Sequence, residues 1–125
     1  MKSREFRTKK RHFQYFKRRC EYWANRFGLG HWEFRFQHRN DGGSAAYVYR
    51  DGQNWIAKVG FAKKWHDHKP SRVNIDTAAL DEIGHCLLHG LTLLGKGRFD
   101  WDYVDERAHR TIRRITHALR DEIGK

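Results

Sequence analysis

The stretch Asp76-Thr77-Ala78-Ala79-Leu80-Asp81-Glu82-Ile83-Gly84-His85-Cys86-Leu87-Leu88-His89 belongs to the segment with the clearest helical periodicity in the chain. Apolar residues recur there every three or four positions, which predicts a helix with one apolar face: Ile75, Ala79, Ile83, Leu87, Gly90, Leu91 and Leu94. Asp81, Glu82, His85 and His89 fall on a different face, because residues four apart in a helix stack one turn above each other. Four residues is also the spacing at which a helix offers two ligands to one metal ion. The pattern therefore predicts metal ligands at Asp81 and His85.

The flanking segments predict an α+β fold in a single domain spanning residues 1–125. Helical spacing predicts helices at about 7–27, 74–94 and 101–123, and alternation predicts strands at 32–37, 45–50 and 55–61. Turn signals at Asn40–Gly43 and Asp51–Asn54 make the three strands an expected antiparallel meander. The expected order is thus an N-terminal helix, the meander, the central helix and a C-terminal helix. Residues 1–6 are expected to form a basic arm.

Residues 62–72 are expected to form an exposed loop. This loop contains His66 and His68, a spacing that can bind metal, but lysines flank the pair and favour solvated histidines.

The composition is strongly basic, with a net charge of +11 and an isoelectric point near 10.1 over 125 residues. Such a charge attracts polyanions, so non-specific nucleic acid is an expected partner, although no known nucleic-acid-binding motif is present. Cys20 and Cys86 fall among apolar neighbours and are expected to be reduced core residues. The chain has no long apolar run and no signal-like segment, so we expect a cytoplasmic protein without membrane insertion.

Leu80-Asp81-Glu82-Ile83-Gly84-His85-Cys86-Leu87-Leu88 resembles the active-site helix of a zincin in which the first histidine of His-Glu-x-x-His is aspartate. The order of the elements and the segment Asp105–Ile115 of the last helix extend the resemblance over nearly the whole chain. Together they resemble small phage-encoded zinc metallopeptidases of the minimal zincin type, related in outline to SprT-like proteins. The resemblance implies a zinc cofactor, Glu82 as the general base, a polypeptide substrate and a place in the cytoplasm of a host cell.

In the family that this chain resembles, the third ligand comes from a residue after the active-site helix. The candidates are Asp105, His109 and Glu106. Relative to the apolar stripe of the last helix, they lie about 60°, about 100° and about 160° from its centre. Helical phase therefore ranks Asp105 first, His109 second and Glu106 last. His89 is a further candidate, either as an alternative ligand or as a partner of a ligand.

Asp81 leaves three interpretations open. An aspartate is an acceptable zinc ligand, although its charge weakens Lewis acidity and loosens the preference for zinc over ions such as manganese. The chain is then a variant metal-dependent peptidase whose substrate pairs with an edge strand, expected at Trp55–Phe61. The second interpretation is a catalytically inactive zincin-fold protein that binds nucleic acid or protein through its basic surface. The third is an unrelated basic interaction module.

Overall fold

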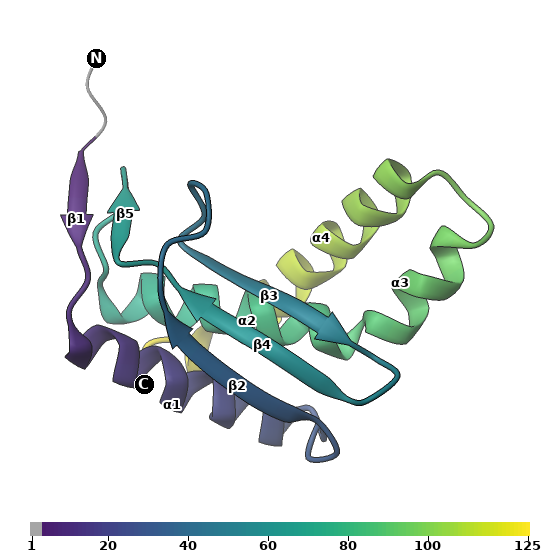
Figure 1. The fold of residues 1–125 in the computed structure, drawn as a ribbon, viewed down its shortest axis with the longest axis horizontal. Coiled ribbons are helices and arrows are strands. Elements are labelled where there is room, and N and C mark those ends of the chain that lie inside the picture. The colour runs from purple at the N-terminus through teal and green to yellow at the C-terminus, as the bar shows by residue number, and fades with distance from the viewer. Residues whose placement is uncertain (1–3) are drawn as a thin grey trace.

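The computed structural model describes residues 4–125 and confirms the α+β class. Two long helices, α1 (Lys10–Arg26) and α2 (Arg72–Leu87), lie behind a three-stranded sheet of β2 (Glu33–His38), β3 (Ala46–Asp51) and β4 (Ile56–Phe61), as Figure 1 shows. A hairpin of α3 (His89–Lys96) and α4 (Trp101–Ala118) extends to one side of this core. A short ribbon of β1 (Glu5–Arg7) and β5 (Lys64–His66) lies at the other side. A 3-10 turn, Arg120–Glu122, follows α4.

The strand order corrects the expected antiparallel meander. The order is β2-β4-β3, with β2 parallel to β4 and β3 antiparallel to β4. The segment after β2 does not form a tight hairpin. It leads the chain to β3, which is not adjacent to β2, and β4 then occupies the position between them. β4 is therefore the central strand, and the free edges of the sheet belong to β2 and β3.

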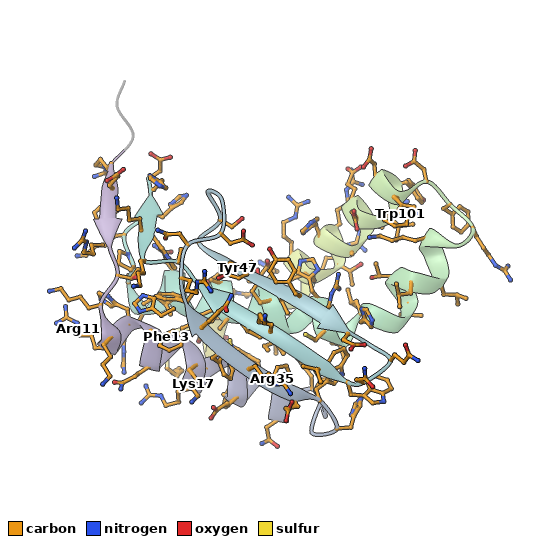
Figure 2. The ribbon with its side chains drawn as sticks, in the orientation of Figure 1. Arg11, Phe13, Lys17, Arg35, Tyr47 and Trp101 are labelled. Atoms are coloured by element: carbon orange, nitrogen blue, oxygen red, sulfur yellow. The ribbon has the colours of Figure 1, made fainter. Side chains whose placement is uncertain are left out.

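Gly60 shows how closely β3 and β4 fit together. It faces Tyr47 across the antiparallel ladder, and any side chain at position 60 would overlap the Tyr47 ring. The hydroxyl of Tyr47, which Figure 2 labels, donates a hydrogen bond to the Arg39 carbonyl at 3.1 Å and accepts one from the Gln37 side chain at 2.9 Å. Tyr47 thus ties β3 to the end of β2 across the central strand.

The expected basic arm and the expected loop pair with each other. Glu5–Arg7 forms an antiparallel ladder with Lys64–His66, so part of the arm is a strand, while residues 1–3 lie outside the described part of the chain. The apolar residues Phe6 and Trp65 explain the pairing, because Trp65 is buried and Phe6 packs against the core. The loop prediction for 62–72 was wrong at β5, although His66 and His68 are exposed as expected.

A buried ion pair joins α1, α2 and the C-terminal segment. The Asp76 carboxylate is fully buried and accepts hydrogen bonds from Arg19 Nε at 2.9 Å, Trp23 Nε1 at 2.7 Å and the Gly124 backbone amide at 2.7 Å. Arg19 also donates to the Glu122 carbonyl at 2.9 Å. Both charged side chains therefore have hydrogen-bond partners, which offsets the free-energy cost of burying them.

The predicted central helix breaks at Leu88, where α2 ends and α3 begins in a new direction. The apolar stripe is correspondingly divided: Ile75, Ala79 and Ile83 are buried, whereas Leu87, Leu91 and Leu94 are exposed. The last helix also ends before the predicted residue 123, at Ala118. Cys20 and Cys86 are free and buried, as predicted. Within residues 4–125, no helix combines the length and the apolar character needed to cross a membrane.

Candidate metal centre

Three potential metal ligands from α2 and α4 lie together at the surface between these helices. Asp81 and His85 lie one turn apart on α2, with Asp81 Oδ2 and His85 Nε2 3.8 Å apart. The His109 ring of α4 meets the His85 ring edge to face, with ring centroids 4.9 Å apart. One ligand atom from each of Asp81, His85 and His109 lies within 4.8 Å of the other two. We call these three residues the Asp81 cluster.

A close approach of the two helices positions His109. Gly84 of α2 has no side chain, and a Cβ atom there would lie 3.2 Å from Cγ1 of Ile112 on α4. Ile112 is buried and lies one turn after His109. The packing of Ile112 on Gly84 therefore brings the preceding turn of α4, which carries His109, alongside His85.

The protonation state of His85 suits a metal ligand. Burial is the largest influence on its pKa and lowers it from the usual value, while the nearby Asp81 carboxylate opposes this effect. His85 is therefore a neutral imidazole at neutral pH, as metal binding requires. Two imidazoles and one carboxylate form a donor set that catalytic zinc sites use, with one position left for water or substrate. The chemistry of the Asp81 cluster thus fits a divalent metal ion.

Asp105, ranked first by helical phase, lies outside the Asp81 cluster. Its Oδ1 atom pairs with Lys96 Nζ at 2.9 Å, a contact supplied by the last turn of α3. Glu106 pairs with Arg110 at 2.7 Å on the exposed side of α4. The structure thus brings His109, the second candidate, to the ligands of α2. Helical phase compares directions around α4 but not positions along it: Val104, next to Asp105, packs near Gly95 of α3, whereas Ile112, one turn after His109, packs near Gly84 of α2.

Glu82, the predicted general base, lies on the buried side of α2. Its pKa is raised to about 8, first because burial disfavours the charged carboxylate and then because Asp81 adds a neighbouring negative charge. Arg50 of β3 acts in the opposite direction. The Arg50 guanidinium also donates to the His85 carbonyl at 2.9 Å, so it attaches β3 to α2 beside the cluster. No sequence pattern singled out Arg50, because it occupies an ordinary position in an alternating strand.

His89 does not join the Asp81 cluster. The break at Leu88 directs it toward the β3–β4 turn, where its ring contacts Gly52 and meets the Trp32 ring edge to face at a centroid distance of 5.7 Å. Both ring nitrogens are buried without hydrogen-bond partners in the described residues. Burial lowers the pKa of His89, and the charge of Arg50 lowers it further.

Two hollows meet at the Asp81 cluster. One, of about 400 Å³, is lined by residues of α2, α4 and the β5 region, among them His66, His68, Asp81 and Arg113. The other, of about 490 Å³, is lined by Asp81, Glu106, His109 and Arg113. Asp81 and Arg113 therefore lie at the border of the two hollows. Arg113 is a further residue that sequence patterns did not single out, because it is one of several arginines on α4.

No protein-family model matches this chain, and no curated protein or solved structure matches it. The fold and the site alone therefore define its class, an α+β protein with a group of three side chains able to hold a metal ion.

Proposed function

We propose that this protein is a metal-dependent peptidase with Asp81, His85 and His109 as metal ligands and Glu82 as the general base. The observation that carries the proposal is the convergence of one carboxylate and two imidazoles, with ligand atoms within 4.8 Å of one another, beside a buried glutamate. The resemblance of the α2 sequence to a zincin helix supports zinc as the ion.

Bound zinc supplies Lewis acidity and lowers the pKa of a coordinated water toward about 7. The task of Glu82 is to accept a proton, which requires its charged form. Part of its raised pKa comes from the Asp81 charge. A cation held by Asp81 offsets that charge and therefore brings the pKa of Glu82 down toward neutral pH.

The substrate strand belongs at β3 rather than at β4. Trp55–Phe61 was the expected edge, but β4 is paired on both sides and has no free backbone groups to offer. β3 has one free edge, and its Arg50 contacts the α2 turn that carries His85. An extended polypeptide added to β3 gains backbone hydrogen bonds and lies next to the Asp81 cluster.

Zinc titration of the metal-free protein tests the ligand set. We expect one equivalent of zinc to bind, and His109→Ala to weaken the binding by about tenfold or more because a ligand is lost. Asp105→Asn is the matched control, since it alters the neighbouring acidic candidate and should leave zinc affinity nearly unchanged. An absence of zinc binding, or a larger loss in Asp105→Asn than in His109→Ala, contradicts the assignment.

Hydrolysis of an unfolded protein such as casein tests the reaction. Glu82→Gln should abolish cleavage by the zinc-loaded protein while zinc remains bound, because only the proton acceptor is removed. A substrate peptide with alternate backbone nitrogens methylated should resist cleavage if it pairs with β3. Cleavage by Glu82→Gln at the rate of the parent protein would contradict the proposed role of Glu82.

The second candidate function is a catalytically inactive protein that binds nucleic acid. A cationic cavity on α1, which shares no residue with the Asp81 cluster, favours it. Zinc-independent nucleic-acid binding without any hydrolysis would select this candidate over the peptidase.

A further inference from the structure

A cavity of about 530 Å³ lies between the first turns of α1 and the start of α2. Its walls include Arg11, Gln14, Tyr15, Arg18 and Arg72, and no aspartate or glutamate lines it. It shares no residue with the Asp81 cluster or with the two hollows that meet there. A positively charged cavity with no acidic wall is suited to an anionic ligand.

The arginines of this cavity differ from several others in the protein because they lack anionic partners. Within residues 4–125, none of Arg11, Arg18 and Arg72 forms an ion pair. Other arginines are paired with acidic side chains: Arg19 with Asp76, Arg26 with Glu122, Arg35 with Glu33 and Arg110 with Glu106. The cavity therefore gathers guanidinium groups whose charge the fold does not neutralise.

Tyr15 holds two of these guanidinium groups against its ring. The guanidinium carbons of Arg18 and Arg72 lie 5.1 Å and 4.8 Å from the centroid of its ring. Such cation–π contacts restrict the arginines before any ligand arrives. The Tyr15 side chain is buried, and its hydroxyl has no hydrogen-bond partner in residues 4–125. The ring, rather than the buried hydroxyl, is therefore what Tyr15 contributes to the cavity.

We propose that this cavity binds a backbone phosphate of single-stranded nucleic acid. Guanidinium groups match phosphate oxygens in pairs, and the Tyr15 ring holds two of them in place. Gln14 lines the cavity, and the exposed Lys10 and Lys17 lie about one turn before and after it on α1, so positive charge continues along the helix. Figure 2 shows Arg11 and Lys17 extending outward from this helix. A flexible single strand can place one phosphate in the cavity and its neighbours near Lys10 and Lys17 at little cost, whereas a stiff duplex would have to be deformed to do so.

Fluorescence anisotropy with a labelled oligothymidylate of about ten nucleotides tests the proposal. Arg18→Gln and Arg72→Gln should each weaken binding by about tenfold, because a charge-assisted contact is lost. Each should also reduce the slope of log affinity against log salt concentration by about 0.7, the contribution of one phosphate in a single strand. Arg114→Gln is the matched control, since it removes an exposed arginine of α4 that forms no ion pair within residues 4–125, and it should change affinity little.

Tyr15→Leu tests the ring that holds the two guanidinium groups, and Tyr15→Phe is its matched control. Oligonucleotide affinity should fall in Tyr15→Leu and change little in Tyr15→Phe, because phenylalanine keeps the cation–π contacts. Equal affinities in these two variants would overturn the role of the ring. Equal losses in Arg114→Gln and in the cavity variants would overturn the site in favour of general attraction to a basic surface.

Three competitors separate the anionic ligands that share this chemistry. Inorganic phosphate should displace the oligonucleotide only weakly, although more than chloride at the same ionic strength, because it fills the cavity alone. A duplex of the same length and a polyglutamate of similar charge should compete less well than an unlabelled single strand. Equal or better competition by phosphate, duplex or polyglutamate would overturn the single-strand assignment. All of these measurements use metal-free protein, so they hold or fail independently of the peptidase proposal.

Discussion

Asp81 is the residue at which the proposed metal site departs most from a zincin helix. Its carboxylate is shorter than an imidazole and is a harder ligand, so it draws the preference of the site toward ions such as manganese. Asp81→His would give the Asp81 cluster three nitrogen ligands. We expect zinc affinity to rise by about tenfold and the ratio of zinc to manganese affinity to rise with it.

Competition against a chelating dye measures both affinities of the Asp81→His variant. Asp105→His is the matched control, because it adds a histidine one turn from His109, outside the cluster. A variant at position 81 that binds zinc more weakly than the parent would mean that the cluster geometry depends on the aspartate itself.

The sequence paired Asp81 with His85 and ranked His109, which the structure places beside them, behind Asp105. Asp81 and His85 could be paired because both lie on one helix, where spacing alone fixes neighbours. His109 lies on another helix, and its distance from His85 depends on how α4 packs through Ile112 on Gly84. The ion pair of Asp105 with Lys96 likewise depends on the direction of α3, which no local sequence pattern predicts.

A buried ion pair between Arg19 and Asp76 joins α1 to α2. We expect Asp76→Asn to lower the free energy of unfolding by about 3–5 kcal/mol, because it leaves the Arg19 guanidinium buried without a counter-charge. Urea unfolding followed by tryptophan fluorescence measures the effect. Arg35→Met is the control: it breaks the exposed pair with Glu33 and should cost at most about 1 kcal/mol. Similar losses in the two variants would contradict the importance of the buried pair.

The strands could be predicted one by one, but their order in the sheet could not. Alternation of apolar and polar residues identifies a strand and its buried face, and it does so for β2, β3 and β4. It says nothing about which strand lies beside which. The parallel pairing of β2 with β4 joins residues such as Gln37 and Gly60, which no turn signal connects. This is why the free edge was assigned to β4 rather than to β3.

Over the whole molecule, two kinds of buried titratable group make stability depend on pH in opposite directions. Burial is the first cause of the lowered pKa values of His38, His85 and His89, so the folded protein resists their protonation. The stability that these neutral histidines contribute is fully present above the unfolded-state pKa of about 6.5 and is lost as the pH falls below it. Glu82 acts in reverse. Its folded-state pKa is raised to about 8, so its contribution is present below the ordinary value of 4.5 and is lost as the pH rises toward 8.

Two variants separate these opposing effects in metal-free protein held in a chelator. His89→Leu removes an imidazole whose two nitrogens are buried without partners, so its gain in stability over the parent should be larger near about pH 5 than near about pH 8. Glu82→Gln should show the opposite trend, with the larger gain near about pH 8, because the unfolded chain no longer gains a charge there. Urea unfolding at both pH values gives the two differences. Equal gains at the two pH values would mean that neither group titrates differently in the folded and unfolded states. Addition of zinc should cancel the trend for Glu82 but not for His89, because only Glu82 lies beside a proposed metal ligand.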